Sequence, residues 1–536
     1  MIRLILIFTF FILSKSSMLL CFSQTNVRSL KSSNKVISFW VNNKHNRWSI
    51  SPETSIDRLE IFCPTGKKKI KFVTDSDSLI FFLGTNDTVA FNILLDNRIA
   101  YTEVIGFSDL PNKISHEEKF YYLSSFWSEV KYNFVNHDKI TFSWDSLYKT
   151  FIPRIAETKN DYDFFRTLQQ FSASLSDGHT QVSDNGYFSK FKDYIPITLR
   201  EFNQKVYIVS IRKGSQLDSS FIGAEITTIS LIPTIEYLKD SVFPYISAST
   251  EHHLWMQGVY SLHSGLVTNS FKATVKKKNG LQENIELKYN GEETRKENDE
   301  YWGRSYDFNS PIVDFLILKN NISFLSINSF HPSVKNLIYN SISNINNTNG
   351  LIIDLRRNGG GSTEVAWLLQ SVLTMNNTFL NFAWQTRVNN GVKKANGNWI
   401  AEYSNYYYNN ALEYNASDTI QIPDSIIKIT VPVVVLIGKY TFSAAEDFLV
   451  NIYNTDNRPI LIGEETGGST GSPLVIPLPY SGYGRICTRR ICYPGTNIPF
   501  INMGIKPDIF IECTLDSFLS HKDEQLEKAI EIILRQ

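Results

Sequence analysis

A serine stands at the start of a predicted helix in residues 440–448, Tyr-Thr-Phe-Ser-Ala-Ala-Glu-Asp-Phe, shortly after a strand that ends at Ile437. At a helix N-terminus, the hydroxyl of Ser443 sits in the positive end of the helix dipole. The N–H of the next residue, Ala444, has no partner within the helix and can donate to a developing oxyanion. The pattern indicates a nucleophilic serine, although serine also caps many helices without any chemical role.

A glycine-rich loop at residues 354–362 follows another predicted buried strand and precedes a helix-like stretch. Its three glycines, at positions 359–361, let the backbone turn tightly and present N–H groups to an approaching oxygen. The loop lacks both the Gly-Lys-Ser/Thr ending of a phosphate cradle and the full dinucleotide fingerprint. An oxygen-binding loop and a plain strand–helix turn both remain open at this point.

A serine hydroxyl is a weak nucleophile and needs a neighbouring base. Among the nine histidines we choose His179, which lies at a helix–strand junction beside Gly178. The alternative is a purely structural histidine, because spacing does not show whether His179 reaches Ser443. His252 and His253 are adjacent and point in different directions, and no His-Glu-x-x-His pattern occurs. We therefore expect no catalytic metal and no cofactor.

A second serine lies in a motif that we set aside. Residues 467–471, Gly-Gly-Ser-Thr-Gly, match the G-x-S-x-G nucleophile elbow. That elbow needs a helix after it, whereas Pro473 and an extended apolar run follow here. We do not expect Ser469 to be the nucleophile.

The rest of the sequence predicts the elements that must position these residues. Residues 24–110 show short β-rich runs between turn residues, which is typical of a small all-β module. Residues 111–193 hold amphipathic helical stretches, the last of which is expected to stop at Gly178. Strands dominate residues 194–300. In residues 301–536 strands alternate with helices, which predicts an α/β layer fold with a buried sheet.

The composition is that of a globular protein. The 536 residues contain 53 Lys+Arg and 53 Asp+Glu, so the formal net charge is zero, and 42% are hydrophobic. A neutral balance argues against nucleic acid as a partner. Five cysteines in so long a chain exclude a disulfide-built scaffold.

Residues 1–23 have the features of a secretory signal peptide, with Arg3, an apolar run at residues 4–13 and small residues before Gln24. The apolar run is far short of the roughly 20 residues that a spanning helix needs, so we expect no integral membrane span. We expect cleavage before Gln24 and a secreted or periplasmic protein, with a lipid anchor at Cys21 as an alternative.

Cys487 and Cys492 flank four residues after a turn-rich stretch. In an oxidising compartment they either form a hairpin disulfide or remain two unpaired thiols, and spacing does not decide between these.

Five ordered elements resemble the C-terminal processing (tail-specific) serine proteases, particularly the branch of the tricorn core protease. The resemblance covers roughly residues 115–535. Its elements are residues 175–180, 223–229, 354–361, 441–446 and 503–508.

Together with the β module that the sequence pattern predicts at 24–110, the resemblance gives a multidomain α/β fold. Its further parts are a helical bundle at 111–193, a PDZ-like insert at 194–300 and a ClpP/crotonase-like layered α/β catalytic core at 301–536. It also implies a serine endopeptidase whose partner is an extended peptide or protein substrate, often cleaved near its C-terminus. The oligomeric state stays open.

The resemblance also implies roles for particular residues. Ser443 matches the family nucleophile and His179 matches the tricorn-type general base. The N–H groups of Ala444, Gly359 and Gly360 match the oxyanion hole.

This chain departs from the family pattern at three positions. Ser469 stands where the processing proteases have a lysine base, which favours the serine–histidine branch. Gly178 stands where the tricorn-type site has a serine, and residues 499–502 lack the expected acid. Glu446, one helical turn after Ser443, is a candidate for the group that orients His179, with a structural helix residue as the alternative.

Two other functions compete with the peptidase. A peptide-binding protein that kept the fold but lost turnover is favoured by the missing acid and by Gly178. An acyl-CoA enzyme of the crotonase-like fold would use a similar oxyanion hole but has no need of a Ser443–His179 pair.

Overall fold

The computed structural model describes the strands between residues 25 and 106, and residues 110–535 apart from 268, 290–299, 305–310, 454, 456 and 457. The chain divides into two compact units, Met1–Phe107 and Ser108–Gln536. The predicted signal peptide and Cys21 lie outside the described residues.

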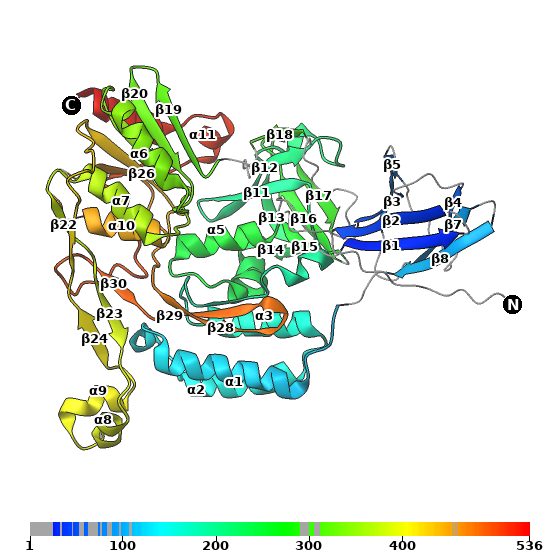
Figure 1. Cartoon of the computed structure of the whole chain (residues 1–536), viewed down its shortest axis with the longest axis horizontal. Helices are drawn as coiled ribbons and strands as arrows, with labels where there is room; N and C mark the ends of the chain where they lie inside the picture. The colour runs from blue at the N-terminus through cyan, green and yellow to red at the C-terminus, as the bar shows by residue number, and fades with distance from the viewer. Residues whose placement is uncertain are drawn as a thin grey trace. The chain divides into compact units, whose positions relative to one another are not determined.

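The first unit is made of antiparallel strands (Figure 1). One sheet has the order β1-β2-β3-β6-β5 and the other the order β4-β7-β8. The strands are β1 (Thr25–Ser32), β2 (Lys35–Lys44), β3 (Arg47–Pro52), β4 (Arg58–Phe62), β5 (Val73–Asp75), β6 (Ser78–Phe82), β7 (Thr88–Leu95) and β8 (Arg98–Gly106). This unit therefore has the all-β character that its turn-rich sequence predicts.

The second unit begins with three helices, α1 (His116–Asn133), α2 (Trp144–Ala156) and α3 (Asp161–Ala173). They pack through aromatic side chains, with the rings of Trp144 and Phe171 stacked 4.3 Å apart. The helix α3 ends at Ala173, before the predicted stop at Gly178, and the left-handed backbone conformation falls on Ser176 instead.

A second sheet follows the helices and has the order β11-β12-β13-β16-β17, with β14 beside β13 and β18 beside β12. A helix, α5 (Glu251–Ser261), packs on this sheet through Trp255 and Val259. The strands are β11 (Ile197–Phe202), β12 (Lys205–Arg212), β13 (Glu225–Ile229), β14 (Ile232–Pro233), β16 (Ser270–Lys276), β17 (Gln282–Lys288) and β18 (Tyr301–Gly303).

The α/β core is built on a sheet of order β19-β20-β21-β26-β27-β31, which is parallel except for the edge strand β19. Its strands are β19 (Val313–Leu318), β20 (Ile322–Ile327), β21 (Leu351–Asp354), β26 (Val433–Ile437), β27 (Ile460–Gly463) and β31 (Ile509–Phe510). The near-continuous apolar runs of β21 and β26 are typical of parallel strands covered on both faces.

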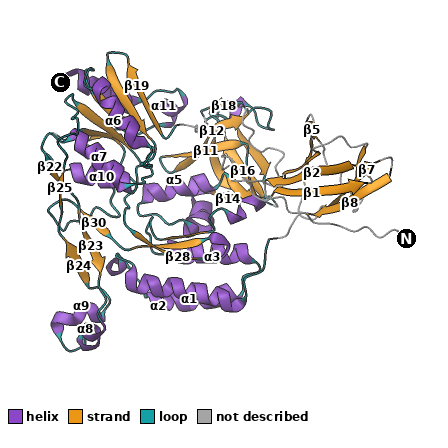
Figure 2. Ribbon diagram, in the orientation of Figure 1, coloured by secondary structure: helices purple, strands orange, loops and turns teal. Residues whose placement is uncertain are grey.

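Helices cover both faces of this sheet (Figure 2). Ile353 and Val435 pack against the helices on one face, while Ile352 and Val434 point to the other face, as the period of two in a strand requires. The helices of the first face are α6 (Val334–Ile345), α7 (Thr363–Leu373) and α10 (Ala444–Ile452), and α12 (Glu524–Arg535) covers the second. This is the layered α/β core that the sequence predicts, within a multidomain chain.

Smaller elements surround the core. They are β9 (Gln181–Ser183), β10 (Lys192–Tyr194), β15 (Ser264–Leu266), β22 (Thr378–Leu380), β23 (Ala383–Arg387), β24 (Leu412–Asn415), β25 (Thr419–Gln421), β28 (Pro473–Pro477), β29 (Tyr483–Cys487), β30 (Arg490–Cys492), α4 (Thr234–Tyr237), α8 (Gly391–Asn396), α9 (Ser404–Tyr407) and α11 (Leu515–Leu519). The three-stranded sheet β28-β29-β9 joins two parts of the second unit. Its strand β9 follows the helical segment, while β28 and β29 belong to the core segment.

Cys487 and Cys492 do not form the hairpin disulfide that was one of the two expectations. Cys487 ends β29 and Cys492 ends β30, two strands of different sheets, and both thiols are free and buried.

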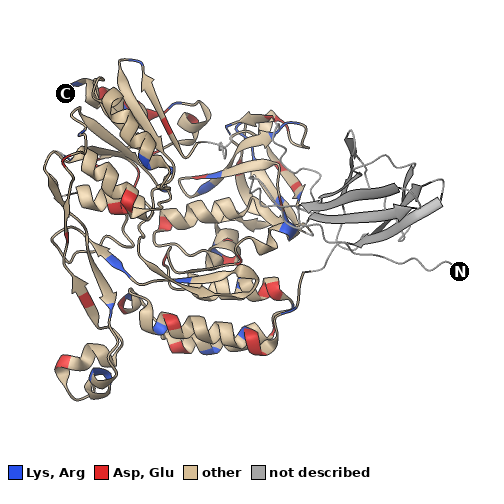
Figure 3. Cartoon of the chain, viewed as in Figure 1, with Lys and Arg blue, Asp and Glu red and all other residues tan. Residues whose placement is uncertain are grey.

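Acidic and basic residues are spread over the helices and strands of the second unit, with both signs on α1, for example (Figure 3). In the part of the chain that the structure describes, no helix combines the length and apolar character needed to cross a membrane.

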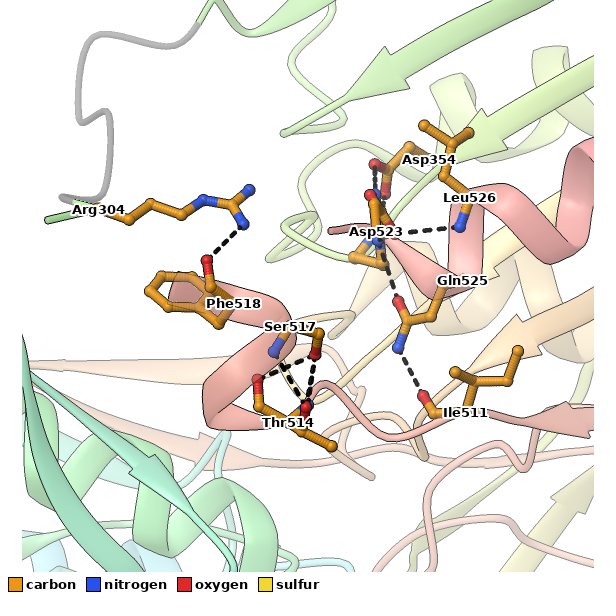
Figure 4. A network of polar contacts seen from close by, with 10 residues as sticks. Arg304, Asp354, Ile511, Thr514, Ser517, Phe518, Asp523, Gln525 and Leu526 are labelled. Carbon is orange, nitrogen blue, oxygen red and sulfur yellow. Dashed lines mark hydrogen bonds and ion pairs between the residues drawn. The ribbon is translucent and has the colours of Figure 1, made fainter. Parts of the chain in front are cut away.

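A partly buried ion-pair network joins the start of α12 to the loop after β21 (Figure 4). The Arg356 guanidinium donates to Asp354 at 2.6 Å and to both carboxylate oxygens of Asp523 at 2.8 Å. Gln525 accepts from Arg356 at 3.0 Å and donates to the carbonyl of Ile511 at 2.7 Å. The base of the glycine-rich loop is therefore fastened to the first turn of α12.

We expect Asp523→Asn to lower the free energy of unfolding by about 1–3 kcal/mol, because Arg356 loses a charged, two-point acceptor in a partly buried site. The measurement is urea unfolding at neutral pH. Glu531→Gln, on the surface of the same helix, is the matched control and should change the free energy by less than about 0.5 kcal/mol. Equal losses in both variants would contradict a special role for the network.

Candidate active site

Ser443 lies on a tight turn between β26 and α10. Its backbone adopts φ 57° and ψ −129°, a conformation that non-glycine residues rarely take. The turn is held from both sides, since Thr441 Oγ1 donates to the carbonyl of Leu355 at 2.8 Å and the N–H of Phe442 donates to the carbonyl of Asn358 at 2.9 Å. Strain of this kind is found where a side chain must be presented for function.

His179 reaches this turn from the segment after α3. Its Nε2 lies 3.0 Å from Ser443 Oγ, across 264 positions of sequence. The imidazole stacks on the ring of Phe442, with centroids 4.8 Å apart and an interplanar angle of 7°. The N–H of His179 also donates to Asp177 Oδ1 at 3.0 Å. The structure thus brings together the two residues that the sequence put forward as nucleophile and base.

Gly178 has a packing reason to be glycine. A Cβ atom at this position would lie 2.8 Å from Cζ of Phe442. The ring that stacks on His179 therefore occupies the space that a serine at position 178 would need.

The environment of His179 favours the neutral imidazole. Burial lowers the pKa of His179 to about 3, and the charges of Arg485 and His253 lower it further. His179 is only 5% exposed. Because the group is neutral at pH 7, it can accept a proton there.

The N–H groups near Ser443 divide into two kinds. Within the described residues, the N–H groups of Ala444 and Gly359 have no hydrogen-bond acceptor, whereas the N–H of Gly360 donates to Asn358 Oδ1 at 2.9 Å. Gly360 instead lets the loop approach Ser443 closely, because a Cβ atom at position 360 would lie 2.5 Å from Cβ of Ser443. Its φ of 98° also favours glycine.

Ser469 belongs to the site although sequence reasoning missed it. Its Oγ lies 2.8 Å from Nδ1 of His179, on the opposite side of the ring from Ser443. The strand β28 follows this segment. This confirms the prediction that no helix comes after the motif, which was the reason for rejecting it as a nucleophile elbow. The available signal was its place in the chain, where the related proteases carry a lysine.

Glu446 is fully buried, and none of its hydrogen bonds goes to His179. Its carboxylate accepts from Thr466 Oγ1 at 2.5 Å and from the N–H groups of Gly468 at 2.8 Å, Ser469 at 3.0 Å and Ser443 at 3.3 Å. Burial raises the pKa of Glu446 to about 8, against the lowering effect of these donors. The carboxyl group holds the backbone on both sides of the histidine, and no hydrogen bond joins it to the imidazole.

No acid reaches the imidazole from residues 499–502 either. Phe500 and Ile501 are buried, and the N–H of Asn502 donates to the carbonyl of Gly468 at 2.9 Å. Across the described residues, no cluster of three or more His, Cys, Asp or Glu side chains is arranged to hold a metal ion.

Comparisons with known proteins bear on this arrangement. Residues 321–511 match the sequence model of the family described as peptidase family S41. The structure of mature CPAF complexed with lactacystin is 14% identical, with 78% of this chain and 98% of that chain covered and a TM-score of 0.56. A search of curated proteins found no match.

Two further solved structures are similar to the chain. The photosystem II D1 C-terminal processing protease is 13% identical, with 74% of this chain and 93% of that chain covered and a TM-score of 0.42. The tricorn protease is 13% identical, with 95% of this chain and 46% of that chain covered and a TM-score of 0.39.

The region that matches the family contains Ser443, the glycine-rich loop and Ser469. The likeness to CPAF covers 78% of this chain and shows a shared fold. On these grounds residues 321–511 match peptidase family S41, and the fold of the chain is similar to that of mature CPAF.

Proposed function

We propose that this chain is a secreted serine endopeptidase in which Ser443 is the nucleophile and His179 is the general base. The observation that carries the proposal is the 3.0 Å separation between His179 Nε2 and Ser443 Oγ at a strained turn. The neutral state of His179 supports the role of base. The N–H groups of Ala444 and Gly359 are our candidates for the oxyanion hole, with Gly360 as the residue that keeps the turn open.

The reaction that this geometry supports is acyl transfer. The hydroxyl proton of Ser443 moves to His179 Nε2 while Oγ bonds to the carbonyl carbon of the scissile peptide. The carbonyl oxygen takes the negative charge and is held by the two N–H groups. The C–N bond then breaks, and the leaving amine takes the proton from Nε2. Water repeats the sequence on the acyl-serine, giving a carboxylic acid product and the free enzyme.

Extended peptides, including the C-terminal regions of proteins, are the proposed substrates. A cavity of about 300 Å³ lies between β11 and α5 on one side and the core on the other. Lys439, four residues before Ser443, bridges Glu201 of β11 at 3.2 Å and Glu464 of the core at 3.3 Å. We propose that residues 194–300 act as a PDZ-like insert that presents the substrate at this cavity.

Secretion is a separate part of the proposal and rests on residues 1–23. Release of the signal peptide before Gln24 is expected to leave a secreted or periplasmic enzyme. N-terminal sequencing of the exported protein distinguishes Gln24 from an intact Met1 and from a chain that begins at a lipidated Cys21.

The second candidate function is peptide binding with little or no turnover. One observation favours it, because the group at Nδ1 of His179 is the neutral hydroxyl of Ser469 and not a carboxylate. Cleavage of casein or of a C-terminal peptide decides between the two functions.

We expect a fluorophosphonate probe to label the protein covalently, because it traps an activated serine. Ser443→Ala should abolish labelling, and His179→Ala should slow it by at least about 10³-fold. Ser472→Ala, at an exposed serine, is the control. Lactacystin, which is complexed with mature CPAF in its solved structure, is a second probe. Equal labelling of Ser443→Ala and the wild type would refute the assignment.

We expect kcat/KM to stay level as the pH falls from 7 to about 5, because the pKa of His179 is lowered to about 3 and the base remains unprotonated. An unperturbed histidine would instead lose activity below about pH 6.5. Arg485→Gln removes a cation that lowers this pKa and should move the acid limb to higher pH. The measurement is the pH profile of peptide cleavage, and a wild-type limb near pH 6.5 would contradict the buried neutral base.

A further inference from the structure

His179 is held between two serines. Ser443 Oγ faces its Nε2 at 3.0 Å and Ser469 Oγ faces its Nδ1 at 2.8 Å. Ser469 is fully buried and His179 nearly so, so the Nδ1 contact is shielded from water. A base of this kind needs its second nitrogen occupied, because that contact fixes both the ring orientation and the position of the ring proton.

One carboxylate ties the two serines together. Glu446 accepts the N–H of Ser469 at 3.0 Å and the N–H of Ser443 at 3.3 Å through the same oxygen, Oε2. The N–H of Ser443 also donates to the carbonyl of Ser469 at 3.1 Å. The contacts form a closed ring of Glu446, Ser443, His179 and Ser469, so the spacing of the hydroxyls on either side of the imidazole depends on this carboxyl group.

The segment that carries Ser469 is fixed from α5 as well. Thr250 Oγ1 donates to the carbonyl of Gly467 at 3.1 Å, and His252 Nε2 lies 2.6 Å from the carbonyl of Thr466. A serine on so constrained a loop has little freedom to move away from the imidazole.

We propose that Ser469 is the positioning residue of His179, accepting the Nδ1–H in place of the missing acid, and that Glu446 acts through it by fixing the backbone of both serines. The proposal rests on the proposed role of His179 as base. In the step that forms the acyl-enzyme, the proton from Ser443 enters Nε2 and the Nδ1–H stays in place. Ser469 Oγ then accepts a hydrogen bond from the charged imidazolium, and no further proton is transferred.

This arrangement differs from one with a carboxylate at Nδ1. A hydroxyl is a neutral acceptor and stabilises an imidazolium less than a charged group does. Glu446 supplies a carboxyl group near the site. Its four hydrogen bonds, however, come from backbone N–H groups and from the Thr466 hydroxyl. Glu446 therefore fixes the positions of the two serines and does not form an ion pair with His179.

The first test needs no variant. Long-range ¹H–¹⁵N correlation of the full chain labelled with ¹⁵N-histidine, with His179 assigned by comparison with His179→Gln, reports which ring nitrogen carries the proton at pH 7. The expected result is a proton on Nδ1. A proton on Nε2 would overturn the proposal, whether or not the protein cleaves peptides.

The second test is kinetic. Ser469→Ala leaves the Nδ1–H buried without an acceptor, and kcat should fall about 10- to 100-fold with KM changed less than about threefold. Ser472→Ala, on the same loop with an exposed side chain, should match the wild type. In a double-mutant cycle, Glu446→Gln should cost much less in the Ser469→Ala background than in the wild type. Wild-type kcat in Ser469→Ala, or independent effects in the cycle, would refute the proposal.

The outcomes separate this inference from the proposed function. If the wild type neither cleaves peptides nor reacts with the fluorophosphonate, the proposed function fails, and the position of the ring proton still tests Ser469. If the wild type cleaves and Ser469→Ala cleaves equally well, only the positioning role fails.

Discussion

The contact between His179 and Ser443 is the constraint on which the rest of the molecule depends. It joins residues 264 positions apart, so the helical segment and the core must dock in one fixed way. The short strand β9, which begins two residues after His179, pairs with β29 of the core segment. The N–H of Cys487 adds a hydrogen bond to Thr180 Oγ1 at 3.0 Å. The histidine is therefore anchored by backbone pairing directly beside it.

Burial sets the chemical character of this contact. The imidazole is packed against Phe442 and kept neutral, while the buried carboxyl of Glu446 is surrounded by hydrogen-bond donors. Two parallel strands, β21 and β26, end at the same edge of the sheet and carry the glycine-rich loop and the Ser443 turn. The glycine-rich loop, Ser443 and His179 thus meet where the sheet ends, and the packed interior of the core holds them rigidly.

Local patterns in the sequence predict much of this arrangement. The apolar runs of β21 and β26, the serine that precedes α10 and the glycines before α7 each follow from rules that act over a few residues. The tertiary pairings could not be predicted in the same way. Ser469 lies 290 positions from His179, and its motif was set aside because no helix follows it. Gly178 was expected to end a helix, but the ring of Phe442, a residue distant in sequence, explains why it is glycine.

The pairing of Arg356 with Asp523 joins residues that leave the ribosome at different times. Arg356 stands at the base of the glycine-rich loop, and Asp523 immediately precedes α12, 167 positions later. A nascent chain on the ribosome presents the loop long before α12 emerges, so the loop lacks its anchor for most of the time of synthesis. The glycine-rich loop therefore acquires its contact with Asp523 only after the segment that begins α12 has docked.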